Sequence, residues 1–356
     1  MLHLPLITLA LALPSPTVDS VRIGLASLFK PTEVRVTILD GPDAVLEVGG
    51  VRLLLRPSEE IRVVLHPGAD EMQLVGPDSR SDIPSAALRV RLISTGSAMQ
   101  LVLPGKLQRR VRGDLSISPS VSRRSLLLLL HVDLESAVSS VVAAELAGNR
   151  NTEALKAMAI VARTYMLSHL ARHKFDGFDF CDTTHCQFYR GEDDWMEGLP
   201  PPVVAAAVSA TKGEIVCYRG SIVETYYTAA CGGLTHAPRA VWGGRSRNRY
   251  HYVRVACVWC RESPYWRWDR SASTSLVFDA VSSSAGFHVS DNAELIARAD
   301  RVTGLVRDVL VKDGRRSVAM NVETFRSVLG RRLGWNTVRS PSFTIERRGS
   351  SFLFRG

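Results

Sequence analysis

Short runs in which apolar and polar residues alternate follow one another between Val21 and Leu103. The runs are rich in β-branched residues, and turn signals built from glycine, proline and aspartate separate them. They read VRIGL, EVRVTIL, AVLEV, VRLLL, IRVVL and ALRVRLI. Alternation with a period of two residues is typical of strands that bury one face. The sequence therefore predicts a β-rich N-terminal domain over residues 21–103.

The pattern changes in the second third of the chain. The run LLLLL at 126–130 predicts one more buried strand, and ESAVSSVVAAEL at 135–146 predicts a helix that Gly148 closes. Asn151 or Thr152 can cap a second helix, in which apolar residues recur with the three- and four-residue spacing of one helix face. We interpret this stripe as core packing; its members are Leu155, Met158, Ala159, Ala162, Tyr165 and Met166.

Alternation returns at Gly213–Ala230, on both sides of Arg219-Gly220, and predicts two paired strands. Helices and strands therefore intermingle beyond residue 103. We expect an α+β fold, in which the β-rich N-terminal domain precedes a mixed helix/strand domain of catalytic type over residues 104–356.

An apolar core, Leu4–Leu13, opens the chain and is followed by small residues and proline. It predicts a secretory signal peptide over residues 1–20, with cleavage near Ser15–Val18, and hence export to the periplasm, the cell envelope or the medium. Neither Lys nor Arg precedes this core, and the alternative is a buried first strand. Apolar runs stay shorter than the ~18 residues that span a bilayer, which excludes a polytopic membrane protein.

Composition narrows the class of protein further. Hydrophobic residues make up 46% and charged residues 22% of the chain, which excludes a wholly disordered or collagen-like protein. The formal net charge is +9; six of the 44 basic residues are lysines, and the remaining 38 are arginines spread over the whole length. This excess reflects either an arginine-rich composition or attraction to a polyanion, such as nucleic acid or the acidic polymers of a bacterial wall.

The densest group of reactive side chains lies in CDTTHCQ at 181–187. Cys181, His185 and Cys186 lie within six positions, and together with His173 they could supply four tetrahedral ligands to zinc. The alternatives are a Cys181–Cys186 disulfide or two ordinary thiols. Two cysteines and two histidines leave no open position for water, which favours a structural role for such a zinc ion.

The other cysteines are Cys217, Cys231, Cys257 and Cys260. In an exported protein, six cysteines indicate disulfides, but the sequence does not fix their pairing. The motif Cys257-x-x-Cys260 is compatible with a redox pair, half of a metal site or two disulfide partners. Nothing near it favours the redox interpretation.

One carboxylate, Glu145, ends the small and apolar stretch VVAAE at 141–145. Such surroundings favour the protonated form of a carboxyl group, which a general acid needs near neutral pH. The alternative is a solvated side chain on the outer face of the helix, and position alone favours this alternative.

Three separated segments carry the signature of a family. They read HVDLESAVSSVVAAELAGNRNTEALKAMAIVARTYMLSHL, FDFCDTTHCQFYRG and YYTAACGGLTHAPRAVWGG. In this order and at these distances they resemble the sporulation stage II protein D / amidase-enhancer family of bacterial cell-wall proteins. The resemblance runs from about Leu103 to the C-terminus. Family members usually continue into a G-x-G-H-G-V-G-M motif where this chain ends at Gly356, so we expect a C-terminally truncated domain whose activity depends on whether that motif lines the groove.

The resemblance implies a lytic transglycosylase that cleaves the glycan strands of peptidoglycan. The family's V-(V/A)-A-(S/A)-E pattern places the catalytic acid/base at Glu145. This residue would protonate the glycosidic oxygen and then accept the proton of the muramyl C6 hydroxyl, which closes a 1,6-anhydro ring. Since no water nucleophile is needed, the second carboxylate of ordinary glycosidases is dispensable, and Asp182 is the candidate if there is one.

The resemblance also implies zinc at the CDTTHCQ segment and groove residues at Arg163, Tyr165 and Tyr227, the last together with Cys231-Gly232-Gly233. For these groove residues, packing is an equal alternative. Two other functions compete with glycan cleavage: a non-catalytic wall-binding enhancer of an N-acetylmuramoyl-L-alanine amidase, and a zinc hydrolase that cuts stem peptides. A nucleic-acid partner is disfavoured, because the sequence shows neither an aromatic-basic platform nor a groove-reading helix.

Overall fold

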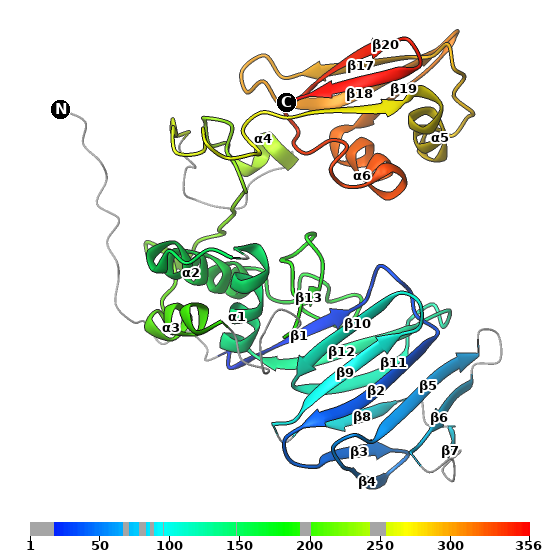
Figure 1. The fold of residues 1–356 in the computed structure, drawn as a ribbon, viewed down its shortest axis with the longest axis vertical. Helices are drawn as coiled ribbons and strands as arrows, with labels where there is room; N and C mark the ends of the chain where they lie inside the picture. Colours follow the sequence, from blue (N-terminus) through cyan, green and yellow to red (C-terminus); the bar gives the residue numbers. More distant parts are fainter. Residues whose placement is uncertain are drawn as a thin grey trace. The chain divides into compact units, whose positions relative to one another are not determined.

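The computed structural model describes residues 18–66, 71–77, 83–85, 89–94, 96–146, 148–192, 201–242 and 254–356. Contacts between residues divide the chain into two compact units, Met1–Thr225 and Tyr226–Gly356 (Figure 1). The predicted signal-peptide core, Leu4–Leu13, lies outside the described residues. None of the helices in the described ranges is long and apolar enough to cross a membrane.

Two β-sheets make up most of the first unit. One sheet has seven strands in the order β13-β1-β12-β11-β8-β3-β4, and the other has six in the order β10-β9-β2-β5-β6-β7. The strands are β1 (Ser20–Leu25), β2 (Glu33–Asp40), β3 (Ala44–Val48), β4 (Val51–Leu55), β5 (Glu60–His66), β6 (Glu71–Val75), β7 (Ile83–Ser85), β8 (Val90–Ile93), β9 (Ala98–Leu103), β10 (Leu107–Arg112), β11 (Asp114–Pro119), β12 (Leu126–Asp133) and β13 (Phe180–Cys181). Burial alternates along most of them, as in β2, where Val34, Val36 and Ile38 are fully buried.

The seven-stranded sheet joins parts of the chain that are far apart in sequence. Strand β1 pairs antiparallel with β12 and parallel with β13. The predicted boundary between residues 103 and 104 falls inside the first unit, in the turn that connects β9 to β10. The β-rich region and the helical region after it are therefore part of the same compact unit.

Three helices gather at one end of the two sheets: α1 (Leu134–Glu145), α2 (Thr152–Ser168) and α3 (Pro202–Ala210) (Figure 1). Asp133 caps α1 by accepting a hydrogen bond from the Ser136 amide at 2.9 Å. The Asn151 side chain caps α2, accepting from the amides of Glu153 and Ala154. Every member of the predicted apolar stripe of α2 is buried, so its interpretation as core packing is confirmed.

The predicted hairpin is confirmed, but its strands are short: β14 (Cys217–Tyr218) pairs with β15 (Ser221–Ile222). Arg219 and Gly220 connect them with φ angles of 49° and 78°. Positive φ at both central residues is typical of the tight turns that match the twist of a hairpin.

The second unit packs two three-stranded sheets and two helices around its own apolar core. Its elements are α4 (Pro238–Trp242), β16 (Asp269–Ser273), α5 (Thr274–Ala285), β17 (Glu294–Ala299), β18 (Val306–Asp313), β19 (Arg316–Asn321), α6 (Val322–Leu333), β20 (Thr344–Arg348) and β21 (Ser351–Arg355). Phe278, Phe325, Phe352 and Phe354 are among its largest fully buried side chains. The expected α+β fold class is confirmed.

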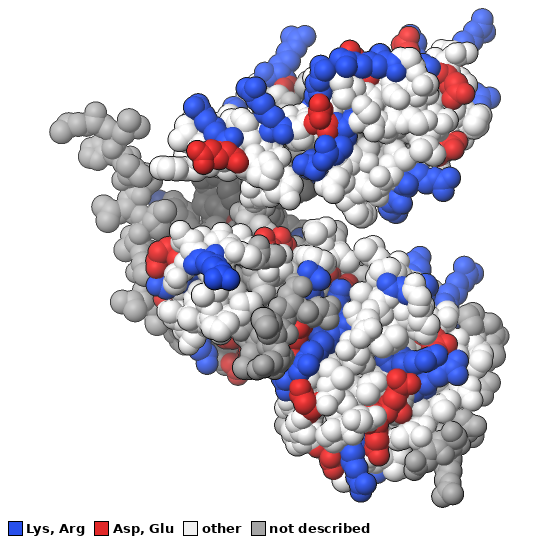
Figure 2. Space-filling view, viewed as in Figure 1, with Lys and Arg blue, Asp and Glu red and all other residues white. Residues whose placement is uncertain are grey.

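Charged side chains are distributed over both units. On the face shown in Figure 2, Lys and Arg side chains are interspersed with Asp and Glu side chains. This distribution agrees with an arginine-rich composition spread along the whole chain.

Candidate functional site

The structure brings the four predicted zinc ligands together. We call His173, Cys181, His185 and Cys186 the first thiol cluster, because their ligand atoms all lie within 4.8 Å of one another. The Nδ1 atom of His185 lies 3.7 Å from Sγ of Cys181 and 3.6 Å from Sγ of Cys186. The Nε2 atom of His173 lies 3.4 Å from Sγ of Cys186. A tetrahedral zinc ion with ordinary bond lengths separates a sulfur ligand from a nitrogen ligand by about 3.6 Å, so this donor set fits zinc.

Local contacts orient the ligands of this cluster. An Asp176 carboxylate oxygen lies 3.0 Å from Nδ1 of His173, the ring nitrogen that does not face the cluster. A carboxylate at this position is a usual outer partner of a metal-binding histidine. Thr183 accepts hydrogen bonds from the backbone of His185 and of Cys186 and so shapes the turn. The hydrogen bond with Cys186 holds the pKa of the Cys181 thiol well below its usual range, which favours the thiolate that a metal binds.

A buried ion pair holds the loop at Asp182, next to the cluster. Asp182 is 4% exposed, pairs with Nη1 of Arg109 in β10 at 2.5 Å, and accepts the Ala26 amide at 2.8 Å. Burial raises the pKa of Asp182, against the attraction of the Arg109 charge. These contacts give Asp182, the candidate second carboxylate, a role in fixing the loop.

The loop then runs alongside helix α1 and contacts Glu145 directly. The Phe188 amide donates to Oε1 of Glu145 at 3.2 Å, and the Arg190 amide donates to Oγ of Ser140 at 3.2 Å. Phe188 follows Cys186 by two residues, so one short stretch of backbone connects the first thiol cluster to Glu145. The Glu145 side chain is half-buried at the end of its helix.

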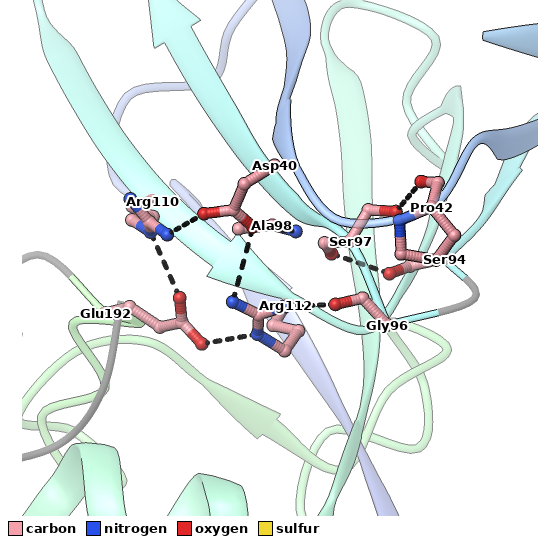
Figure 3. A network of polar contacts seen from close by, with 9 residues as sticks. All are labelled: Asp40, Pro42, Ser94, Gly96, Ser97, Ala98, Arg110, Arg112 and Glu192. Atoms are coloured by element: carbon pink, nitrogen blue, oxygen red, sulfur yellow. Dashed lines mark hydrogen bonds and ion pairs between the residues drawn. The ribbon is translucent and has the colours of Figure 1, made fainter. Parts of the chain in front are cut away.

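The end of the loop is fixed by charged groups from β10 (Figure 3). Glu192 is 3% exposed and accepts hydrogen bonds from Nε of Arg110 at 3.2 Å and from Nε of Arg112 at 3.0 Å. Arg110 also binds Asp40 of β2 at 2.5 Å. Just before Glu192, Gly191 has φ +67°, and a Cβ atom there would overlap the carbonyl oxygen of Arg110. The β-rich region thus holds both ends of the loop that carries the cluster.

A separate cavity of about 200 Å³ lies at the start of α1, where Asp133, Ser136, Tyr189 and Glu192 are among its lining residues. Ser136 and Glu145 are nine positions apart in the helix, which corresponds to about 14 Å along the axis. The cavity and Glu145 therefore belong to opposite ends of α1.

The predicted groove residues occupy different positions. Arg163 is 1% exposed and binds Glu135 through two hydrogen bonds of 2.8 and 2.6 Å, and Tyr165 is buried and stacks on His169. Both positions agree with the packing alternative. Tyr227 is partly exposed and belongs to the second unit.

The sequence analysis did not single out Gln187, which lies between Cys186 and Phe188. Its side chain is 4% exposed, and among the described residues neither Oε1 nor Nε2 has a hydrogen-bond partner. Buried side-chain amides without a hydrogen-bond partner are uncommon in native structures. Its position directly after a predicted ligand was the only signal in the sequence that could have drawn attention to it.

Comparison with known proteins finds a family model that matches part of the chain. Residues 122–218 match the family model described as "SpoIID: Stage II sporulation protein". The chain contains a SpoIID domain. The matched residues include Glu145 and the whole first thiol cluster, and the resemblance found in the sequence is confirmed.

Three relatives support distant homology around this SpoIID domain. The amidase enhancer of Bacillus subtilis (strain 168) is 32% identical over 105 residues, which is 30% of this chain and 13% of the relative. Stage II sporulation protein D of the same strain is 28% identical over 148 residues, covering 38% of this chain and 42% of the relative. An uncharacterized protein of Brachyspira hyodysenteriae is 33% identical over 122 residues, which is 33% of this chain and 31% of the relative. The matches span less than half the length of each of these relatives.

Proposed function

We propose that this chain is a bacterial cell-envelope protein that cleaves peptidoglycan glycan strands by lytic transglycosylation, in sporulation or in wall remodelling. One observation supports this above all others: Glu145, the acid/base that the family resemblance implies, lies within the residues that match the SpoIID model, and the Phe188 amide donates to its carboxylate at 3.2 Å, next to the first thiol cluster. A positioned carboxyl group is the one catalytic group that the reaction requires.

In the proposed mechanism, Glu145 first donates its proton to the oxygen of the bond between N-acetylmuramic acid and N-acetylglucosamine. This oxygen departs with the N-acetylglucosamine unit. The carboxylate then accepts the proton of the muramyl C6 hydroxyl, whose oxygen bonds to the anomeric carbon. Glu145 ends the cycle protonated as it began, and a general acid/base of this kind contributes ~10²–10⁴-fold to the rate.

His173, Cys181, His185 and Cys186 would hold the zinc ion of this proposal. When bound, zinc supplies a cross-link between the segment before β13 and the loop after it. Because four protein ligands complete its coordination, the proposed role is structural. The chain's own residues then orient Glu145 through the backbone from Cys186 to Phe188.

Digestion of purified glycan strands, intact and stripped of peptides, tests the reaction. Mass spectrometry should find anhydro-muramyl ends, which are lighter than hydrolytic ends by one water. Glu145→Gln keeps the shape of the side chain but removes the proton, so turnover should fall ~10²–10⁴-fold. The matched control is Glu153→Gln, an 80% exposed side chain at the start of α2. Reducing muramyl ends, or full turnover in Glu145→Gln, would reject the mechanism.

We further propose export of the chain, directed by the apolar segment Leu4–Leu13. N-terminal sequencing of protein from the native host should find a chain that begins after this segment. An intact Met1 in the cytosolic fraction would refute export.

The similarity to a relative called an amidase enhancer favours a second candidate function. In that case the chain would bind glycan and stimulate a cell-wall amidase without cutting the strands itself. Sedimentation with purified cell walls and an amidase assay, run with wild type and Glu145→Gln, separate the two functions. Equal stimulation by both proteins without anhydro ends would favour the enhancer.

A further inference from the structure

A second group of three thiols lies in the second unit, outside the residues matched by the SpoIID model. We call Cys231, Cys257 and Cys260 the second thiol cluster; their Sγ atoms lie within 4.8 Å of one another. The Sγ atoms of Cys231 and Cys260 are 3.7 Å apart. Two thiolates on one tetrahedral zinc ion lie about 3.8 Å apart, because Zn–S bonds are about 2.3 Å long. The thiols thus have the spacing of ligands that share a metal ion.

The second thiol cluster is formed by two segments of backbone, which we call its first arm (residues 231–235) and its second arm (residues 255–260). Backbone pairing brings the two arms together. Leu234 and Ala256 form an isolated antiparallel bridge. On either side of it, the Cys257 amide donates to the Gly233 carbonyl at 2.9 Å and the Thr235 amide donates to the Val255 carbonyl at 3.0 Å. Cys231 is therefore placed beside the Cys257-x-x-Cys260 turn by the course of the backbone.

Both arms turn their backbone N–H groups toward the sulfur atoms. The Gly233 amide is directed at the Cys231 thiol, and the amides of Trp259 and Cys260 are directed at the Cys257 thiol. Gly232 and Gly233 have φ angles of 66° and 99°, and a Cβ atom on Gly233 would lie 2.8 Å from the Trp266 ring. The glycines are thus needed for the first arm to turn.

The described residues around the second thiol cluster contribute little apolar packing. Every hydrophobic residue described between 226 and 267 is partly or largely exposed, and the apolar core of the second unit begins at Trp268. Trp259, between two cysteines of the cluster, is 90% exposed. Segments that cannot bury enough apolar surface are commonly stabilised by a metal ion or disulfides.

We propose that Cys231, Cys257 and Cys260 bind one zinc ion as three thiolates and so tie the turn at 231–233 to the turn at 257–260. Each thiol loses its proton to solvent on binding, and no electrons are exchanged. A disulfide would use two of the three thiols and leave the third close to it without a role, whereas a metal uses all three. Among the described residues no fourth His, Cys, Asp or Glu joins the group, so three protein ligands are proposed.

Counting zinc in the full-length chain tests the proposal, and the test does not depend on glycan cleavage. The background is Cys181→Ser/Cys186→Ser, which removes both thiols of the first cluster. Native mass spectrometry of this protein, purified under reducing conditions, should find about one zinc ion per chain. Adding Cys257→Ser/Cys260→Ser should remove it. The matched control is Cys217→Ser in β14, a cysteine that belongs to neither cluster.

Cobalt(II) provides a second measurement on the otherwise unmodified chain. Replacement of zinc by cobalt should give visible bands of a tetrahedral ion and near-ultraviolet absorption from thiolate ligands, and Cys231→Ala should weaken that absorption. If the background variant does not fold, the wild type should still lose one zinc ion per chain on substitution of Cys257 and Cys260. A disulfide within Cys231, Cys257 and Cys260 in the native protein, or a folded background variant that binds no zinc, would overturn the proposal.

Discussion

The two thiol clusters hold their ligand atoms equally close, but the protein around them differs. The loop of the first cluster is fixed by Asp182 with Arg109, by the contact of Phe188 with Glu145, and by Glu192. Near the second cluster, by contrast, the described residues contribute backbone hydrogen bonds and exposed apolar side chains. Two sets of ligands can therefore have similar spacing for different reasons. In one, the contacts of the folded protein hold the ligands in place, and in the other, the bound ion does. We expect the first cluster to keep its shape without metal and the second to lose it.

Breaking the buried ion pair next to the first cluster should have the largest effect. Arg109→Met leaves the Asp182 carboxylate buried without its guanidinium partner, and loss of one partner of a buried pair costs about 3–5 kcal/mol. Urea denaturation followed by circular dichroism measures the unfolding free energy of the first unit. As a control in the same unit, Arg52→Met in β4 removes an ion pair with Glu47 whose arginine side chain is 75% exposed, which should cost less than about 1 kcal/mol. Equal losses in the two variants would show that the loop is not held by this pair.

The second largest effect should come from removal of metal, which should change hydrogen exchange at the two clusters by different amounts. In the second cluster, the Thr235 and Cys257 amides are hydrogen-bonded, and their hydrogen exchange should accelerate by about 100-fold on chelation, equivalent to about 2.7 kcal/mol. In the first, the Phe188 and Glu192 amides are bound to Glu145 and to the Arg110 carbonyl, and their exchange should change less than about tenfold. Equal acceleration at all four amides would remove the difference between the clusters.

A glycine in the loop of the first cluster offers a smaller test of how tightly the protein fixes it. Gly191→Ala introduces a Cβ atom that overlaps the Arg110 carbonyl oxygen, at a residue with φ +67°. Gly148→Ala is the matched control, because Gly148 has φ +76° but open space around its Cβ position. Both variants carry the strain of the left-handed backbone, so the extra cost of Gly191→Ala, about 1–2 kcal/mol in urea denaturation, measures the close approach. Equal costs would mean that the loop moves away from β10 easily.

The elements of the fold could be predicted from the sequence because their signals are local. Period-two alternation indicated the strands of the β-rich region, and the stripe from Leu155 to Met166 indicated the buried face of α2. The joining of these regions could not be predicted, because β1 pairs with strands that follow it by more than a hundred residues. Pairing at that distance depends on tertiary packing, which no short segment encodes.

The same limit explains what the sequence showed of the candidate site. The four residues of the first cluster lie close in sequence, so their spacing predicted that they share one metal ion, and the structure brings them together. The contact of Asp182 with Arg109, 73 positions earlier, could not be predicted, because no local pattern links the two residues. Likewise, Cys257-x-x-Cys260 was a pair with three open interpretations, because nothing local indicated that Cys231 joins it.

The smallest expected effect is the pH dependence of stability that comes from Asp40. Asp40 is the most exposed member of the group of ion pairs that holds the loop of the first cluster. Burial alone would raise the pKa of Asp40, but the Ala98 amide and the Arg110 charge outweigh it and lower that pKa. A lowered pKa in the folded state means that ionised Asp40 stabilises the fold above its unfolded pKa of ~3.9, and that this contribution disappears as pH falls through the folded value. Since about half of the Asp40 side chain is exposed, we expect less than about 1 kcal/mol.

Asp40→Asn tests this on metal-free protein, so that protons competing for the thiols do not enter. Urea denaturation at neutral pH should show the variant slightly less stable than the wild type, because a neutral amide in place of the Asp40 carboxylate offers no charge to Arg110. The difference should stay constant down to about pH 5 and then shrink toward zero as Asp40 of the wild type becomes protonated. A difference that persists below about pH 3 would assign the stabilisation to the shape of the side chain. A difference that grows on acidification would mean that the pKa of Asp40 is raised in the folded state. Asp40 would then not belong to the network of ion pairs that holds Glu192.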